Sequence, residues 1–131
     1  MVDGLTRDDS SQIGFVTACL FSEAITLDDL HNWCVHLISQ HDVADLPSYV
    51  FELVDFDGYL KDIYETIGFS AGFSRTPSED LALQGLAVLR GRQPYELHVS
   101  PAQAVSMVAQ HPEILARFRE VFPFIEVNMS E

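Results

Sequence analysis

The first candidate for chemistry is a serine in residues 68–72, whose sequence GFSAG matches the G-x-S-x-G pattern of serine nucleophiles. Such a nucleophile needs a strand before the serine, a helix directly after it, and a parallel sheet around both. The residues before Ser70 have the spacing of a helix that ends at the first glycine, and loop residues follow it. Asp80, with His98 or His111, gives a triad in the usual chain order, but the strands of the sheet are missing. We therefore predict that Ser70 is a loop residue and not catalytic.

The second candidate is a pair of aspartates, Asp55 and Asp57, in the stretch VFELVDFDGYL. This stretch resembles the first motif of the haloacid dehalogenase superfamily, and the resemblance implies a Mg²⁺-dependent phosphatase. That family also needs a distant lysine and a further acidic pair, whereas the only lysine is Lys61, four residues on. Calcium-binding loop spacing fails as well, because Leu53 and Tyr64 would stand at the first and last ligand positions. We interpret the pair as exposed acids at a helix end, and a small Mg²⁺-dependent phosphatase or hydrolase remains an alternative.

The third candidate is a possible zinc site formed by His31, Cys34 and His41. Zinc sites on one helix use histidines four residues apart, and that spacing is absent. On a helical wheel Cys34 and His41 share a face with the leucines, while His36 points away. We predict no catalytic residue, no metal and no cofactor. Cys19 and Cys34 are predicted to be buried free thiols.

The elements that must position these residues are predicted to be helices almost throughout. Helix-capping signals agree with the periodicity of the apolar residues. The predicted caps and helices are Thr26 before Leu27–His41, Thr76 before 77–90 with Gly91 after it, and Ser100 before a helix to His111 that restarts at Pro112. Residues 49–57 fit either a helix or a buried strand, and we favour the helix because helices precede and follow it. FIEVN, residues 124–128, fits a short terminal strand or an extended tail.

The fold prediction is therefore an all-α protein of five to seven helices. At 131 residues the chain has the length of one domain, which we place at residues 11–131 after a flexible N-terminus at residues 1–10. No apolar run reaches the roughly 18–20 residues that span a bilayer. The acidic N-terminus lacks the order of a signal peptide, so we expect a cytoplasmic location.

Charge is the strongest indication of function. The net charge is −13, and residues 8–60 contain no lysine or arginine. A strongly negative potential repels nucleic acid and anionic membranes, and it attracts basic proteins or metal cations. An acidic surface kept for solubility, or for a salt-rich environment, is the other interpretation. The acids that we expect to be exposed and to pair with a basic protein are Asp28, Asp29, Asp42, Asp45, Asp55 and Asp57.

A resemblance supports this binding hypothesis. Residues 25–56, which contain ITLDDLHNWCVHLI and DLPSYVFELVDF, are similar to a segment of small helical bacterial proteins. Several such proteins resemble immunity proteins of toxin systems, which neutralise a cognate toxin by binding it. The resemblance implies a non-enzymatic module that binds a basic, nuclease-like toxin. An adaptor subunit that self-associates through Phe118, Val121 and Phe122 is a further alternative.

Overall fold

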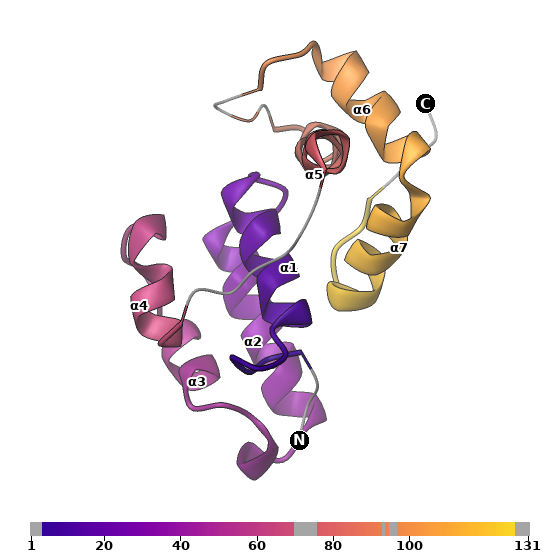
Figure 1. Ribbon diagram of the computed structural model, residues 1–131. Helices are drawn as coiled ribbons and strands as arrows, with labels where there is room; N and C mark the ends of the chain where they lie inside the picture. The colour runs from indigo at the N-terminus through magenta and orange to yellow at the C-terminus, as the bar shows by residue number, and fades with distance from the viewer. Residues whose placement is uncertain (1–3, 70–75, 93, 95–96, 128–131) are drawn as a thin grey trace. The chain divides into compact units, whose positions relative to one another are not determined.

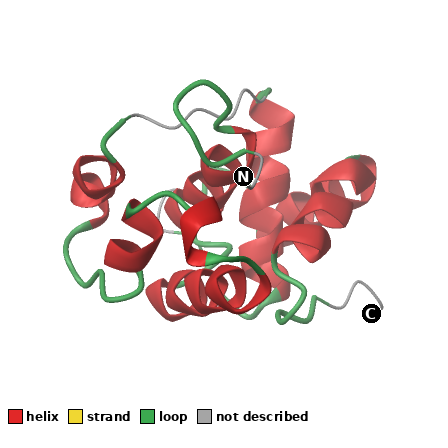
Figure 2. Ribbon diagram, turned by 90° about the horizontal axis from the view of Figure 1, so that it is seen from below, coloured by secondary structure: helices red, strands yellow, loops and turns green. Residues whose placement is uncertain are grey.

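The computed structural model describes residues 4–69, 76–92, 94 and 97–127 (Figure 1). Its elements are α1 (Ser11–Phe21), α2 (Leu27–Gln40), η1 (Val43–Asp45), α3 (Tyr49–Leu53), η2 (Leu60–Asp62), α4 (Ile63–Ile67), α5 (Pro77–Leu89), α6 (Pro101–Gln110) and α7 (Pro112–Val121). Figure 2 shows only helix and loop in the described part of the chain. The prediction of an all-α protein with five to seven helices is confirmed, with seven α-helices among the described residues. No strand forms at the described residues 124–127.

The chain divides into two compact units. Unit 1 comprises residues 1–20 and 26–73, and unit 2 comprises residues 21–25 and 74–131. The sequence did not indicate this division, because no linker rich in glycine, serine or proline separates the two. No helix among the described residues combines the length and the apolar character that a membrane crossing requires.

Unit 1 is built around apolar faces that its sequence pattern predicted. The face of α2 that carries Leu30, Trp33 and Leu37 is buried, as expected from their helical spacing. The helix predicted within residues 49–57 is confirmed but short, since α3 ends at Leu53 and a turn follows. Helix α4 ends at a glycine in the left-handed conformation, as predicted for residue 68.

The described part of the N-terminal segment makes defined contacts in unit 1. Leu5 is fully buried, and its carbonyl accepts a hydrogen bond from the hydroxyl of Tyr49. The carbonyl of Gly4 accepts from the amides of Gln12 and Ile13 at the start of α1. The sequence, which predicted a flexible segment at residues 1–10, did not indicate these contacts of Gly4 and Leu5.

Unit 2 contains α5, α6 and α7, and capping boxes begin the first two of these helices. Thr76 and Ser100 are the N-caps, each with a proline at the first helical position, as the sequence predicted. The loop at residues 21–25 is held in this unit by two arginines. Arg90 donates to the carbonyl of Ala24 at 2.7 Å, and Arg92 donates to that of Glu23 at 3.0 Å.

Helices α5 and α6 lie in close contact at Gly85. A Cβ atom at this position would lie 2.2 Å from the carbonyl oxygen of Ala104 and 2.7 Å from a methyl group of Val108. Only glycine therefore fits between the two helices at this point.

We expect Gly85→Ala to lower the free energy of unfolding by about 1–3 kcal/mol, because the new methyl group overpacks a contact with backbone atoms. At an ordinary helix position, replacing glycine by alanine raises the free energy of unfolding by about 1 kcal/mol. The change expected at Gly85 has the opposite sign. Urea unfolding followed by circular dichroism measures the change. Ala109→Gly, at an exposed position of α6, is the control and should show the ordinary preference for alanine. A more stable Gly85→Ala variant would contradict the close contact.

Candidate functional site

Three of the predicted binding acids lie in two segments of unit 1 that one hydrogen bond joins. His31, on α2, donates from Nε2 to the carbonyl oxygen of Phe56 at 2.6 Å. Phe56 stands between the exposed Asp55 and Asp57, and the exposed Asp28 precedes His31 by one helical turn. The bond therefore ties the chain after α3 to the beginning of α2, and the three exposed acids lie in the two segments that it joins.

The other predicted acids do not join this group. Asp42 is exposed and Asp45 is half-buried at the opposite end of α2, where they begin and end η1. Fourteen residues of helix span about 20 Å, so these two acids form a separate group.

Asp29 is buried, with an exposed fraction of 9%, and the prediction that it is exposed is wrong. Its carboxylate accepts a hydrogen bond from the amide of Thr26 at 2.8 Å, and its own amide donates to the Thr26 hydroxyl at 3.1 Å. This capping box satisfies amides that would otherwise lack partners at the start of α2. Asp29 therefore holds the beginning of the helix.

Of the two motifs that suggested catalysis, only the aspartate pair lies wholly among the described residues. Ser70 falls outside the described residues. Asp55 and Asp57 follow a helix where the phosphatase motif requires a strand. Among the described residues, the group of three side chains close enough to share a metal ion contains neither aspartate.

The histidines and cysteine of α2 do not converge as a zinc site. His31 is bonded to Phe56, Cys34 is fully buried, and His41 is exposed. Burial raises the pKa of the Cys34 thiol to about 12, which favours the neutral thiol. The predicted buried free thiols at Cys19 and Cys34 are confirmed.

The apolar face proposed for self-association is also covered. Phe118 and Phe122 are fully buried and Val121 is 8% exposed. The two phenylalanine rings pack against each other with centroids 5.0 Å apart. Within the chain these three side chains therefore form no exposed apolar face.

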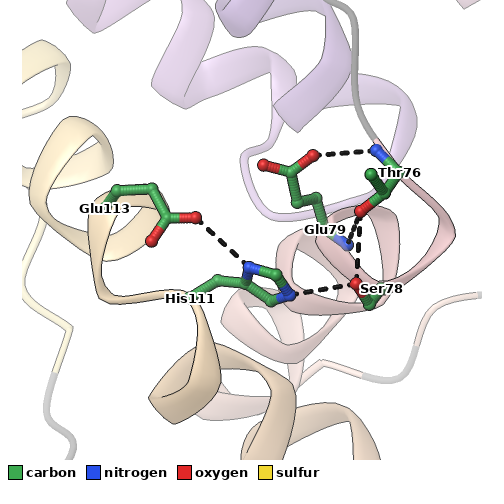
Figure 3. Close-up of polar contacts among 5 residues, drawn as sticks. All are labelled: Thr76, Ser78, Glu79, His111 and Glu113. Carbon is green, nitrogen blue, oxygen red and sulfur yellow. Dashed lines mark hydrogen bonds and ion pairs between the residues drawn. The ribbon is translucent and has the colours of Figure 1, made fainter.

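A polar cluster in unit 2 was not predicted (Figure 3). His111, between α6 and α7, contacts the hydroxyl oxygen of Ser78 through Nε2 at 3.0 Å. Its Nδ1 atom lies 3.2 Å from a carboxylate oxygen of Glu113. Glu79 adds a second carboxylate, and its Oε1 atom accepts from the amide of Thr76 at 2.8 Å. Glu79, His111 and Glu113 each offer a ligand atom, and these atoms lie within 4.8 Å of one another.

This cluster can support two kinds of chemistry. The order serine, histidine, carboxylate is that of a nucleophile, its base and the group that orients the base. Two carboxylates beside an imidazole form instead a donor set for a cation. Glu113 is held in its charged form, because a hydrogen bond from its own backbone amide, followed by the contact with His111, lowers its pKa.

The sequence indicated the local positions of some residues of this cluster but not the contact between them. The capping box that begins at Thr76 places Ser78 and Glu79 in the first turn of α5, and His111 was named as a possible partner for another serine. The contact between Ser78 and His111 joins residues 33 positions apart, which no local pattern indicates. Asp80 is half-buried on α5 and His98 is exposed, and neither belongs to the group of metal-ligand atoms.

Comparisons of the chain with protein-family models, with curated proteins and with solved structures return no match. Function must therefore be argued from the residues themselves.

Asp29→Ala should lower the free energy of unfolding by about 1–2 kcal/mol, because it removes the acceptor of the Thr26 amide. Asp28→Ala, the same change one residue earlier, should lose only the attraction to the helix dipole, about 0.3–1 kcal/mol. Urea unfolding of the two variants measures the difference. Equal losses would show that the capping box contributes nothing beyond the charge.

The raised pKa of Cys34 should make stability fall at alkaline pH. In the unfolded chain the thiol ionises near its ordinary pKa of 9.0, whereas in the folded chain it stays protonated until about pH 12. The contribution is therefore complete below pH 9 and is lost as the pH rises, by at most about 1.4 kcal/mol per pH unit. We expect Cys34→Ala to show a shallower decline of the free energy of unfolding between pH 8.5 and pH 10.5 than the unchanged protein. Parallel declines would contradict this assignment.

Proposed function

We propose that the protein is a non-enzymatic binding module that captures a basic protein through the aspartate face, defined as Asp28, Asp55 and Asp57. The observation that supports the proposal is the hydrogen bond from His31 to Phe56, because it joins the two segments that carry these three exposed acids. Carboxylates gathered in this way attract a cationic surface from a distance and then pair with its lysines or arginines.

The bases of unit 1 do little to neutralise this face. Among its described residues they are Arg7 and Lys61. Arg7 donates to the carbonyl of Gly68 at 2.8 Å, and Lys61 lies 5.7 Å from the centre of the Tyr59 ring. Neither of these contacts involves a carboxylate of the aspartate face.

The partner class that best suits this face is a basic toxin of the nuclease type. A nuclease carries a cationic surface because it binds phosphate, and an acidic protein that covers this surface blocks its substrate. The resemblance of residues 25–56 to proteins like toxin immunity proteins supports this choice, and the segment contains Asp28 and Asp55. In this role the protein inhibits by occupying a surface and performs no chemistry.

The test is the affinity for the purified product of a neighbouring gene that encodes a basic protein, with an unrelated basic ribonuclease for comparison. Interferometry at 50 and 300 mM NaCl should show specific binding that weakens with salt. The triple variant Asp28→Lys, Asp55→Lys, Asp57→Lys should bind at least about 100-fold more weakly, as expected when charge pairs worth several kcal/mol are reversed.

The matched control is Glu65→Lys, Glu120→Lys, Glu126→Lys, which changes the net charge equally at exposed acids elsewhere. This control should retain most of the affinity. Equal loss in both triple variants would mean that net charge alone matters and would reject the aspartate face as a site. Equal affinity for the unrelated ribonuclease would reject a specific partner.

A further inference from the structure

The cluster in unit 2 has ligand atoms placed as a metal ion requires. Glu79 lies in the first turn of α5, His111 lies at the corner between α6 and α7, and Glu113 lies in the first turn of α7. Ligand atoms that share one Zn²⁺ ion at about 2.1 Å are roughly 3–3.5 Å apart. The three side chains offer atoms within 4.8 Å of one another, and Nδ1 of His111 is already 3.2 Å from Glu113. Small rotations of the exposed Glu113 side chain close the remaining gap.

A cation can enter the cluster without breaking the hydrogen bonds that Glu79 and His111 make to Thr76 and Ser78, and it would replace the contact between Nδ1 of His111 and Glu113. Glu79 uses Oε1 to cap the Thr76 amide, which leaves Oε2 for a cation. His111 can bind metal through Nδ1 while its Nε2–H donates to the hydroxyl of Ser78. Histidines that bind metals commonly donate their second ring N–H in this manner, which fixes the orientation of the ring. The serine of the cluster is then a support for the ligand and not a nucleophile.

The two possible chemistries require different tautomers of His111. A serine nucleophile needs the proton on Nδ1 and a lone pair on Nε2, whereas a metal needs the reverse. The position of Glu79 favours metal binding over a serine nucleophile. Its carboxylate puts a second negative charge close to the imidazole of His111, and this favours a cation there.

We propose that Glu79, His111 and Glu113 bind a divalent transition-metal ion, with Zn²⁺ the ion that suits the site best. One imidazole and two carboxylates match the nitrogen and oxygen ligands of zinc, whereas Mg²⁺ and Ca²⁺ prefer oxygen alone. The bound ion links the beginning of α5 to the corner between α6 and α7. This proposal concerns unit 2 and does not depend on partner binding by unit 1.

The test uses the full chain after removal of metals with a chelator. Calorimetric titration with ZnCl₂ should show one site, and Zn²⁺ should raise the melting temperature by several degrees, because it binds the folded form. Glu79→Gln keeps the capping box, since glutamine also serves at that position. We expect Glu79→Gln, His111→Gln and Glu113→Gln each to weaken Zn²⁺ binding at least about tenfold, and Ser78→Ala to weaken it less.

The matched controls are His98→Gln and Glu120→Gln, an exposed histidine and an exposed carboxylate outside the cluster. They should leave the affinity for Zn²⁺ unchanged. The proposal would be overturned if Zn²⁺ did not bind, or if only the control variants lost binding. It would also be overturned if Mg²⁺ bound as tightly as Zn²⁺ and His111→Gln did not weaken the binding of Mg²⁺. Hydrolysis of p-nitrophenyl acetate in the presence of a chelator, abolished by Ser78→Ala, would also overturn it and assign the cluster to ester hydrolysis.

Discussion

The contact between α5 and α6 at Gly85 is the constraint on which the polar cluster of unit 2 depends. Gly85 lies seven residues after Ser78, and Ala104 lies seven residues before His111. Seven residues are two helical turns, so Ser78 lies on the same face of α5 as Gly85, and His111 lies two turns after Ala104. A wider separation of the helices at the glycine would also separate the serine from the histidine.

The acidic residues show how one residue type serves different purposes in one protein. Asp28 and Asp29 are adjacent in the chain, yet one is exposed and the other caps a helix. In unit 2 the carboxylate of Glu79 caps α5 and also reaches the cluster with His111. Net charge alone therefore overstates the acidic surface that a partner can meet, because part of it is used within the fold.

Local signals predicted most of the fold. The N-cap at Thr26, the capping boxes at Thr76 and Ser100 and the glycine at the end of α4 were all predicted, because each depends on residues within one turn. Contacts between distant segments were not predicted. The spacing of Phe118 shows an apolar face but not what covers it, and nothing near His111 in the chain indicates Ser78.

The loop at residues 21–25 has a consequence for any attempt to dissect the molecule. It lies in the chain between α1 and α2, yet it belongs to unit 2, where Arg90 and Arg92 bind its carbonyl groups. Neither unit is therefore a continuous segment, and no single cleavage of the chain releases one of them whole. A fragment that begins at residue 74 would retain both arginines without their acceptors. A fragment meant to contain one complete unit must therefore include both of its segments.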